Sequence, residues 1–402
     1  MQKKSVKIFL SVVLTLVVLA GAAAVVGVVR NGRTPEAAPV GAAPAETTAP
    51  ATTAPAPQPV TLSFLSVGDN LIHDGIYEQA NRRAGGDGYD FSFCYTRIAD
   101  AVAAADVATI NQETPVAKSY KPSGYPLFNS PVELGQEVAD IGFDVVNLAN
   151  NHMLDKTSKG LLESIEFWDG LSGVVRTGAY KDKADLETVE YIERDGIKIG
   201  LVGVTQYTNG LSLPDDSPLE FLYTSETEAI EKKIKAAADA CDVVLVNAHW
   251  GSEYTTTPSQ DQKNLARQMA AWGADVIIGH HPHVLQPIEW IANADGSQTL
   301  VAYSLGNFIS QQNTAARVIG GMLHYDVTVD PQTKAVTVSN VKLEPIVTHY
   351  VNGAHDVQIY PLSQYTDALA KRQASRIKQS DFSVAYIEDF VRDVIPEEFL
   401  AA

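Results

Sequence analysis

The sequence predicts a mixed α/β domain that begins near residue 60. From that point, short runs of β-branched residues alternate with segments of helical periodicity, and such alternation is typical of α/β architecture. Two later pairs of β-like runs enclose the turn sequences Asp195-Gly196 and Asp295-Gly296, which predicts antiparallel hairpins. With 45% hydrophobic residues among 402, the chain can bury one large core or two smaller ones.

The predicted elements follow one another along the chain. Strands are expected at 62–67, 106–110, 143–148, 243–247 and 275–278. Helices are expected at 96–105, 132–141, 159–169, 225–240, 259–272 and 383–394, the last ending before Pro396. The hairpins comprise 189–193 with 197–204 and 288–291 with 299–304, and the runs 322–329 and 335–343 are expected to form a closing pair.

The first 59 residues predict a membrane attachment rather than part of the folded domain. Residues 1–7 carry three lysines, and residues 8–29 form an uncharged, mostly apolar run long enough to cross a bilayer. This predicts a single-pass transmembrane anchor, with a cytoplasmic basic end and a folded domain outside the cytoplasm. The alternative is a signal peptide cleaved at the alanines 22–24. Residues 30–59, rich in Ala, Pro and Thr, are expected to form a disordered linker.

Charge and cysteine content exclude two classes of function. The formal net charge is −18 at pH 7, and no basic stripe offsets it. A chain this acidic repels a phosphate backbone, so nucleic acid is not an expected partner. The two cysteines, Cys94 and Cys241, lie in no C-x-x-C pair, which excludes a thiolate zinc site. They are expected either to form one disulfide or to remain free thiols.

Five predicted strands end directly in side chains that can bind a metal. These are Asp69, with His73 shortly after it, Glu113 in the run Asn111-Gln112-Glu113, the run Asn150-Asn151-His152, His249, and the run His280-His281-Pro282-His283. The carboxyl ends of strands in α/β sheets open onto a common crevice, where ligands bind. Each residue alone could be a turn residue, a helix cap or a buried histidine. Five such coincidences indicate a shared site.

The three histidines at 280–283 carry the clearest signal of metal binding. Because Pro282 disfavours helix at His281, we expect the run to be extended. Alternate residues of an extended chain point the same way, which places His281 and His283 on one face and His280 on the other. Carboxylate, carboxamide and imidazole ligands without thiolate favour Mn, Fe, Zn or Mg. Since so many groups exceed the needs of one ion, we expect two divalent metal ions.

Other catalytic designs lack their motifs. The sequence contains neither the G-x-S-x-G of a serine hydrolase nor the G-x-x-x-x-G-K-[ST] of a phosphate-binding loop. Gly306-Asn307, in the run SLGNF, is predicted to form only a tight turn. The residues therefore favour metal-dependent chemistry.

The motifs at these strand ends resemble those of a known family. They read GDNLIHDG at 68–75, NQETP at 111–115, VVNLANNHMLD at 145–155, AHWGSEY at 248–254, GADVIIGHHPHVLQP at 273–287 and YSLGNF at 303–308. In this order they resemble the CapA-type poly-γ-glutamate capsule biosynthesis family, which is similar in turn to the calcineurin-like metallophosphoesterases. The resemblance covers residues 60–350 and implies a four-layer αββα sandwich of two mixed sheets, with residues 351–402 as a C-terminal extension.

The resemblance also implies roles for individual residues. One metal would be held by Asp69, His283 and His73, and the other by His249, His281 and Asn151. Glu113 would bridge the two ions, and His152 would be the general acid that protonates a leaving oxygen. The chain departs from the broader phosphoesterase pattern at three positions: three residues rather than one separate Asp69 from His73, Glu113 stands where Asp is usual, and Asn150 stands where Gly is usual.

The expected function follows from the resemblance. The protein would be a cell-membrane protein whose extracytoplasmic domain is a metal-dependent hydrolase of the phosphoesterase type, acting in the synthesis of poly-γ-glutamate or another surface polymer. Its partners would be that anionic polymer or a phosphoester substrate, together with integral-membrane polymer synthase subunits. The alternative is a non-catalytic polymer-binding or assembly subunit that retains the metal site.

Overall fold

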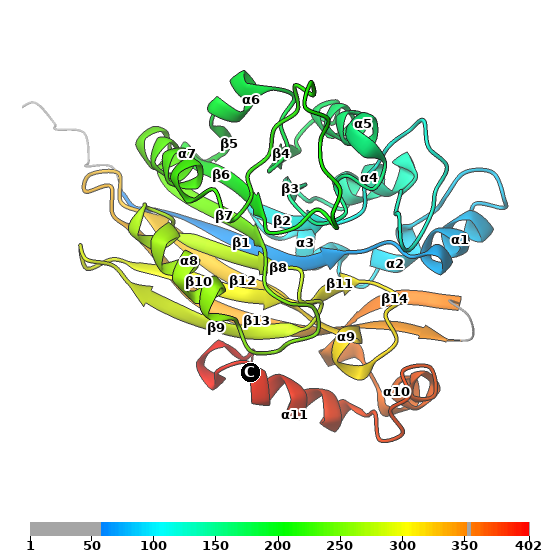
Figure 1. Cartoon of the computed structure of the whole chain (residues 1–402). Coiled ribbons are helices and arrows are strands. Elements are labelled where there is room, and N and C mark those ends of the chain that lie inside the picture. Colours follow the sequence, from blue (N-terminus) through cyan, green and yellow to red (C-terminus); the bar gives the residue numbers. More distant parts are fainter. Residues whose placement is uncertain (1–57, 352–354, 402) are drawn as a thin grey trace, which may run out of the picture. The chain divides into compact units, whose positions relative to one another are not determined.

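A computed structural model describes residues 58–351 and 355–401, which form two β-sheets flanked by helices (Figure 1). The strands are β1 (Val60–Asn70), β2 (Val107–Gln112), β3 (Val145–Asn147), β4 (Val175–Thr177), β5 (Glu190–Arg194), β6 (Ile197–Thr205), β7 (Val243–His249), β8 (Val276–His280), β9 (Leu285–Ala292), β10 (Gln298–Leu305), β11 (Asn307–Ile309), β12 (Ile319–Val329), β13 (Val336–Val351) and β14 (His355–Pro361). The helices are α1 (Asp74–Arg83), α2 (Ser92–Tyr95), α3 (Ala99–Ala103), α4 (Val132–Asp140), α5 (Thr157–Asp169), α6 (Lys183–Glu187), α7 (Thr227–Ala240), α8 (Gln260–Ala271), α9 (Ala315–Val318), α10 (Asp367–Ala374) and α11 (Val384–Val394). Short 3-10 turns span Leu362–Gln364 and Glu397–Phe399.

Both sheets are mixed, as the family resemblance implies. The first has eight strands in the order β14-β13-β12-β1-β2-β3-β4, with β11 also paired to β1. In it, β1 to β4 run parallel, whereas β12, β13 and β14 are antiparallel to their neighbours. The second sheet has six strands in the order β5-β6-β7-β8-β10-β9, with parallel strands in the centre and an antiparallel strand at each edge.

Two apolar cores hold the layers together. The main core combines buried side chains of both sheets, such as Leu65 of β1 and Ile278 of β8, with residues of the helices that cover the first sheet. The second core lies between the second sheet and helices α7 and α8. Ile230, Ile234 and Ala237 of α7 recur at the spacing of one helical face, and all three are buried there. The sheets therefore form a rigid support for the loops at their strand ends.

The predicted hairpins are present, and the helix expected at 96–105 is replaced by the two short helices α2 and α3. Strands β5 and β6 pair antiparallel around Asp195-Gly196, where both residues have positive φ angles of 49° and 79°, as a two-residue hairpin turn requires. Strands β9 and β10 pair in the same way. Helix α8 follows a capping box in which the Ser259 side chain and the Gln262 side chain each accept a backbone N–H of the other residue.

The C-terminal segment is part of the same fold. Strand β14 pairs with β13 at the edge of the first sheet, and residues of α10 and α11 join the main core, including Ala370 and Ile387. Cys94 and Cys241 are free thiols. The predicted anchor at 8–29 and the predicted linker up to residue 57 lie outside the described residues. Within residues 58–351 and 355–401, no helix is both long and apolar enough to cross a membrane.

Candidate metal centre

The candidate site lies where strands of both sheets end. Asp69 is the second-last residue of β1. Glu113 follows β2, and Asn151 follows β3. His249 ends β7, and His281 and His283 follow β8. All six side chains are buried. Three groups of carboxylate and imidazole atoms lie close enough together to hold a metal ion: Asp69 with Glu113 and His283, Glu113 with His249 and His281, and Glu253 with His281 and His283. The structure thus brings most of the predicted ligands into one cluster.

Asp69 owes its position to a close approach between two backbone segments. Its N–H donates to the carbonyl oxygen of Gly306 at 3.0 Å. A Cβ atom added at Gly68 would lie 1.9 Å from that same oxygen, so only glycine fits before Asp69. The Asp69 carboxylate accepts from Asn111 Nδ2 at 2.8 Å and from His283 Nδ1 at 3.0 Å. Burial alone would raise the pKa of Asp69, but the hydrogen bond and charge of His283 lower it below its usual value.

His283 presents one ring nitrogen to the cluster. Its Nδ1 lies 3.0 Å from Asp69 Oδ2 and 3.0 Å from Asn307 Oδ1, and both of these oxygens are acceptors. Nδ1 therefore carries a proton, and Nε2 faces Glu113 Oε1, 3.6 Å away. Burial would lower the pKa of His283, but the Glu113 and Asp69 carboxylates raise it to about 9.

Glu113 is the least satisfied polar group of the site. Its side chain is fully buried, and neither carboxylate oxygen has a hydrogen-bond partner among the described residues. Burial, followed by the nearby charge of Asp69, raises the pKa of Glu113 well above its usual range. A buried carboxylate without donors is costly unless a cation compensates it. The residues present therefore fit a metal ion at Glu113.

A second set of ligand atoms converges on the other side of Glu113. His249 Nε2 lies 3.0 Å from Asn151 Oδ1 and 3.8 Å from Glu113 Oε1, and the His249 and His281 rings are 4.9 Å apart. Nδ1 of His281 has no hydrogen-bond partner among the described residues. Burial lowers the pKa of His281 to about 4, and burial also lowers the pKa of His249 well below its usual value. Both rings are therefore neutral near pH 7, the form that ligates metals.

The histidine run is not extended, so that expectation is wrong. His281 and His283 have φ angles of 95° and 57°, which bend the chain sharply at both residues. The bend is held because Trp250 N donates to the His280 carbonyl at 3.1 Å and Tyr254 N donates to the Pro282 carbonyl at 2.7 Å. His280 also does not point away from the site, since its Nδ1 lies 3.6 Å from Asp69 Oδ1.

His73 stays apart from the cluster. It belongs to none of the three candidate groups found among the described residues. Its Nδ1 lies 3.1 Å from the Leu71 carbonyl oxygen and 3.3 Å from Gln311 N, and its ring packs edge-on against Phe128. Burial lowers the pKa of His73 to about 4. The structure therefore gives His73 a position in the wall of the site, beside Phe128.

His152 forms a dyad with a carboxylate. Its Nδ1 lies 2.7 Å from Asp155 Oδ2, and that oxygen also accepts from Phe128 N at 2.7 Å. Because Nδ1 is engaged, Nε2 is the nitrogen left for a substrate. Asn209 connects this dyad to the metal ligands, since its Oδ1 accepts from Asn151 Nδ2 at 3.2 Å and its Nδ2 lies 3.3 Å from His152 Nδ1.

Sequence reasoning missed the residues that orient the ligands. They are Asn111, Asp155, Asn209 and Asn307; a further candidate ligand, Glu253, was missed as well. Gly306, with φ of 67°, forms the predicted turn, but Asn307 also holds His283 through both its ring and its carbonyl oxygen. Asp155 lies within the motif VVNLANNHMLD, and Glu253 within AHWGSEY, so both motifs contained the signal. Asn209 resembles an ordinary Asn-Gly turn, and nothing in the sequence marks it.

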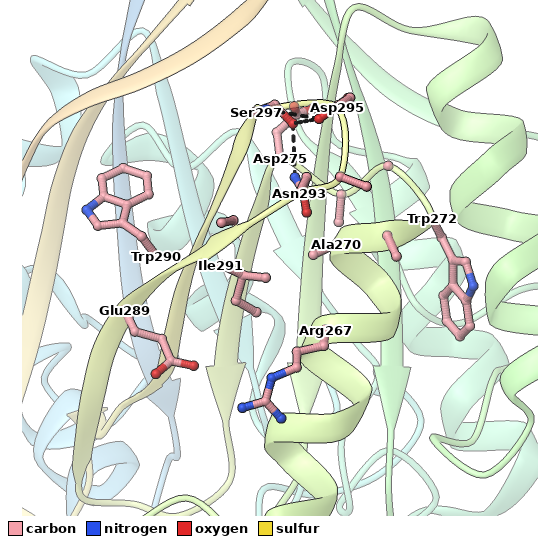
Figure 2. Close-up of a pocket in the computed structure, with 15 residues that line it drawn as sticks. Arg267, Ala270, Trp272, Asp275, Glu289, Trp290, Ile291, Asn293, Asp295 and Ser297 are labelled. Atoms are coloured by element: carbon pink, nitrogen blue, oxygen red, sulfur yellow. Dashed lines mark hydrogen bonds between the residues drawn. The ribbon is translucent and has the colours of Figure 1, made fainter.

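A further hollow on the surface lies elsewhere. It measures about 710 Å³ and is lined by residues of α8, β9 and the loop before β10. Figure 2 shows Arg267 and Glu289 beside it, and Ser297 hydrogen-bonded to Asp295 and Asn293. Asp275, which also lines it, precedes β8, whereas the metal ligands follow that strand. This hollow is therefore at the opposite end of the sheet from the candidate site.

Known proteins are similar to this chain in sequence. The family model described as bacterial capsule synthesis protein PGA_cap matches residues 63–312. The capsule biosynthesis protein CapA of Bacillus anthracis is 29% identical over 274 residues, 66% of this chain and 63% of that protein. The PGA biosynthesis protein CapA of Bacillus subtilis (strain 168) is 32% identical over 256 residues, 62% of this chain and 64% of that protein. The chain thus spans slightly less than two thirds of each relative's length.

The solved structures that resemble the chain are more distant. A novel phosphatase from Mycoplasma pneumoniae superposes with a TM-score of 0.42 and 15% sequence identity, over 72% of this chain and 94% of that one. The family assignment rests on the sequence matches, which cover the strand-end motifs of the candidate site. This chain therefore belongs to the family of bacterial capsule synthesis proteins described as PGA_cap.

Proposed function

We propose that this protein is a membrane-anchored, extracytoplasmic metal-dependent hydrolase that acts in the synthesis of poly-γ-glutamate or another surface polymer. The observation that carries the proposal is the fully buried carboxylate of Glu113, which has no hydrogen-bond donor within residues 58–351 and 355–401 and lies among three histidines and Asp69. A buried carboxylate without hydrogen-bond donors is costly, and bound cations would offset that cost.

The ligand atoms support two divalent ions. Asp69, Glu113 and His283 would hold one, and Glu113, His249, His281 and Asn151 would hold the other, with Glu113 common to both. Oxygen and nitrogen ligands without thiolate suit Mn, Fe, Zn or Mg. When bound, such ions neutralise charge on a phosphoester and lower the pKa of water. The pair would act on a phosphoester bond.

The chain's own residues would supply the proton for the leaving group. Asp155 fixes the His152 ring through Nδ1, and Phe128 packs edge-on against that ring at 4.7 Å between centroids. Nε2 is thereby held in one direction for a leaving oxygen. His152 is only 6% exposed, which limits competition from bulk water. We assign His152 as the general acid and Asp155 as its positioning residue.

Polymer binding and membrane location complete the proposal. The two Bacillus relatives are named for capsule and PGA biosynthesis, and the apolar run at 8–29 has the length of a membrane anchor. The net charge of −18 opposes an anionic polymer, so bound cations at the site would offset that repulsion. Integral-membrane polymer synthase subunits are the proposed partners.

Turnover measurements test the proposal. The full-length protein, purified without chelator, is assayed on bis(p-nitrophenyl) phosphate and on poly-γ-glutamate with and without added Mn²⁺. We expect metal-dependent turnover that falls by about 10²-fold or more in His152→Gln, because a general acid contributes at least that factor. The metal content of His152→Gln should remain that of the wild type.

A matched histidine provides the control. His355 is exposed at the start of β14, and His355→Gln should retain full turnover and full metal content. Protein that binds metal but hydrolyses neither substrate would refute the hydrolase and support the alternative, a non-catalytic assembly subunit. Protein that binds no divalent metal would refute both.

A further inference from the structure

A second polar hollow lies next to the metal centre. It measures about 670 Å³, within the range of small-molecule pockets. Its walls come from the start of α1, the loops after Gly124 and β11, the end of β13, and the turn that follows α10. The lining side chains that matter to the argument are His73, Asp74, Glu78, Arg376 and Lys378. In Figure 1, α1 and α10 are seen on either side of β14.

The hollow shares a wall with the candidate metal centre. His73 lines the hollow, and its ring packs edge-on against Phe128 at 5.2 Å between centroids. Phe128 in turn packs against the ring of His152 at 4.7 Å. His73 is held in this wall by its Nδ1 contacts with Leu71 O and Gln311 N. A ligand in the hollow would therefore lie one aromatic layer away from the proposed general acid.

The charges of this hollow are separated and unpaired. Asp74 and Glu78 belong to α1, whereas Arg376 and Lys378 follow α10. None of these four side chains forms a salt bridge with another or with any other charged group in the part of the chain that the structure describes. The Asp74 carboxylate accepts one long hydrogen bond, from Tyr77 OH at 3.4 Å. Two anionic and two cationic groups thus line one hollow without neutralising each other.

This separation selects for a ligand that carries both signs of charge. A ligand with only negative charge would be attracted by the two cations and repelled by the two carboxylates. A ligand with only positive charge would be attracted by the carboxylates and repelled by the cations. A ligand with an ammonium and a carboxylate can make charge-assisted hydrogen bonds with both sets at once. We propose that this hollow binds a zwitterionic group of the amino-acid type, such as a free amino acid or the amino end of a peptide-like chain.

The cationic half of the hollow lies outside the region that the family model matches. Arg376 and Lys378 lie beyond residue 312, where the family match ends, whereas His73 and Asp74 lie inside it. The turn after α10 is fixed in place because Ile377, between the two cations, is buried in the main core, and Gln373 donates to the Thr348 carbonyl at 2.8 Å. The C-terminal segment therefore adds a ligand pocket beside a site that the matched region builds.

Calorimetric titration of the metal-free protein tests this proposal independently of the metal centre. Glutamate, N-acetylglutamate (which lacks the ammonium) and butylamine (which lacks the carboxylates) are titrated in excess chelator. We expect glutamate to bind about tenfold more tightly than either analogue, since each loses one charge-assisted contact. His281→Ala should bind glutamate as the wild type does, because it alters only the metal ligands.

Variants of opposite charge make the test decisive. Arg376→Gln and Asp74→Asn should each weaken glutamate binding by about tenfold. Lys371 lies on the exposed face of α10, outside the hollow, so Lys371→Gln should leave glutamate binding unchanged. The zwitterion proposal is overturned if N-acetylglutamate binds as tightly as glutamate and Asp74→Asn binds glutamate more tightly than the wild type does. That result would indicate a simple anion site. It is equally overturned if no heat is seen at roughly 50 mM glutamate, which corresponds to negligible affinity.

Discussion

Replacing Glu113 with glutamine is expected to change stability in opposite directions with and without metal. In metal-free protein, the wild-type carboxyl is fully buried and has no hydrogen-bond partner among the described residues. Burial raises the pKa of Glu113 well above its usual range, so keeping this ionisable group in the native state at pH 7 costs free energy, on the order of 1–3 kcal/mol. Glutamine removes the ionisable group while it keeps the side-chain volume, so metal-free Glu113→Gln should be at least as stable as metal-free wild type.

The metal-bound state should show the reverse order. One ion at about 100 times its dissociation constant stabilises the native state by about 2.7 kcal/mol. The entropy of unfolding of a domain this large is roughly 0.7 kcal/mol/K, so this stabilisation raises Tm by about 4 °C. Glu113 belongs to two of the three candidate ligand groups, so Glu113→Gln should lose most of this rise. In metal-free protein the same variant should melt roughly 1–4 °C above wild type.

Differential scanning fluorimetry with Mn²⁺ or with chelator, paired with metal analysis, measures both effects. Glu166, exposed on α5, provides the matched control, and Glu166→Gln should follow wild type in both conditions. The reasoning about Glu113 would be refuted by a variant that keeps the full metal-induced rise in Tm and the full metal content. A metal-free variant well below wild type would show that the carboxylate has a structural role instead.

Three further outcomes are expected. Asp155→Asn should lower phosphodiester turnover by about 10²-fold at unchanged metal content, because His152 loses its orienting carboxylate; equal loss of metal would argue for general damage. Asn307→Leu should weaken metal binding by about 10–100-fold, since it frees the His283 ring, and a competition assay with a fluorescent chelator measures this. Burial raises the pKa of Asp275 from the ordinary 3.8 to about 7. The contribution of the buried, protonated carboxyl to the free energy of unfolding is therefore complete below pH 4 and is lost as the pH rises through 7. Asp275→Asn should therefore flatten the pH dependence of urea unfolding between pH 4 and 8, and an unchanged slope would contradict that pKa.

The sequence predicted the site best where strand periodicity determined position. Asp69, Glu113 and His249 each follow an apolar run, and the end of a buried strand in an α/β fold has few alternatives to the shared edge of the sheet. Their convergence therefore needed only the correct identification of the strands. His73 lies beyond the end of β1, where the chain is no longer constrained by a sheet, and its Nδ1 contacts backbone groups instead.

The orienting residues could not be predicted in the same way. Asn111 lies inside β2, and its amide donates to Asp69 on the neighbouring strand β1. On the other side, Asn147 of β3 donates to Asn111 Oδ1 at 2.9 Å. Asn209 reaches Asn151 from a loop 58 residues later. Such contacts depend on which strands are neighbours and on where loops fold back. Neither is visible in local patterns, since an isolated Asn most often indicates a turn.

The bend at the histidine run explains why the motif AHWGSEY accompanies it. Positive φ angles at His281 and His283 cost roughly 1–3 kcal/mol each and persist only where surrounding structure enforces them. Trp250 N and Tyr254 N donate to carbonyl oxygens on either side of His281, so the segment after β7 clamps the bend. The same bend brings the imidazoles of His281 and His283 to neighbouring candidate ligand positions, whereas an extended chain would hold the two rings further apart. The strain is thus connected to the candidate metal site, and the segment that carries His249 also holds the other two histidines in place.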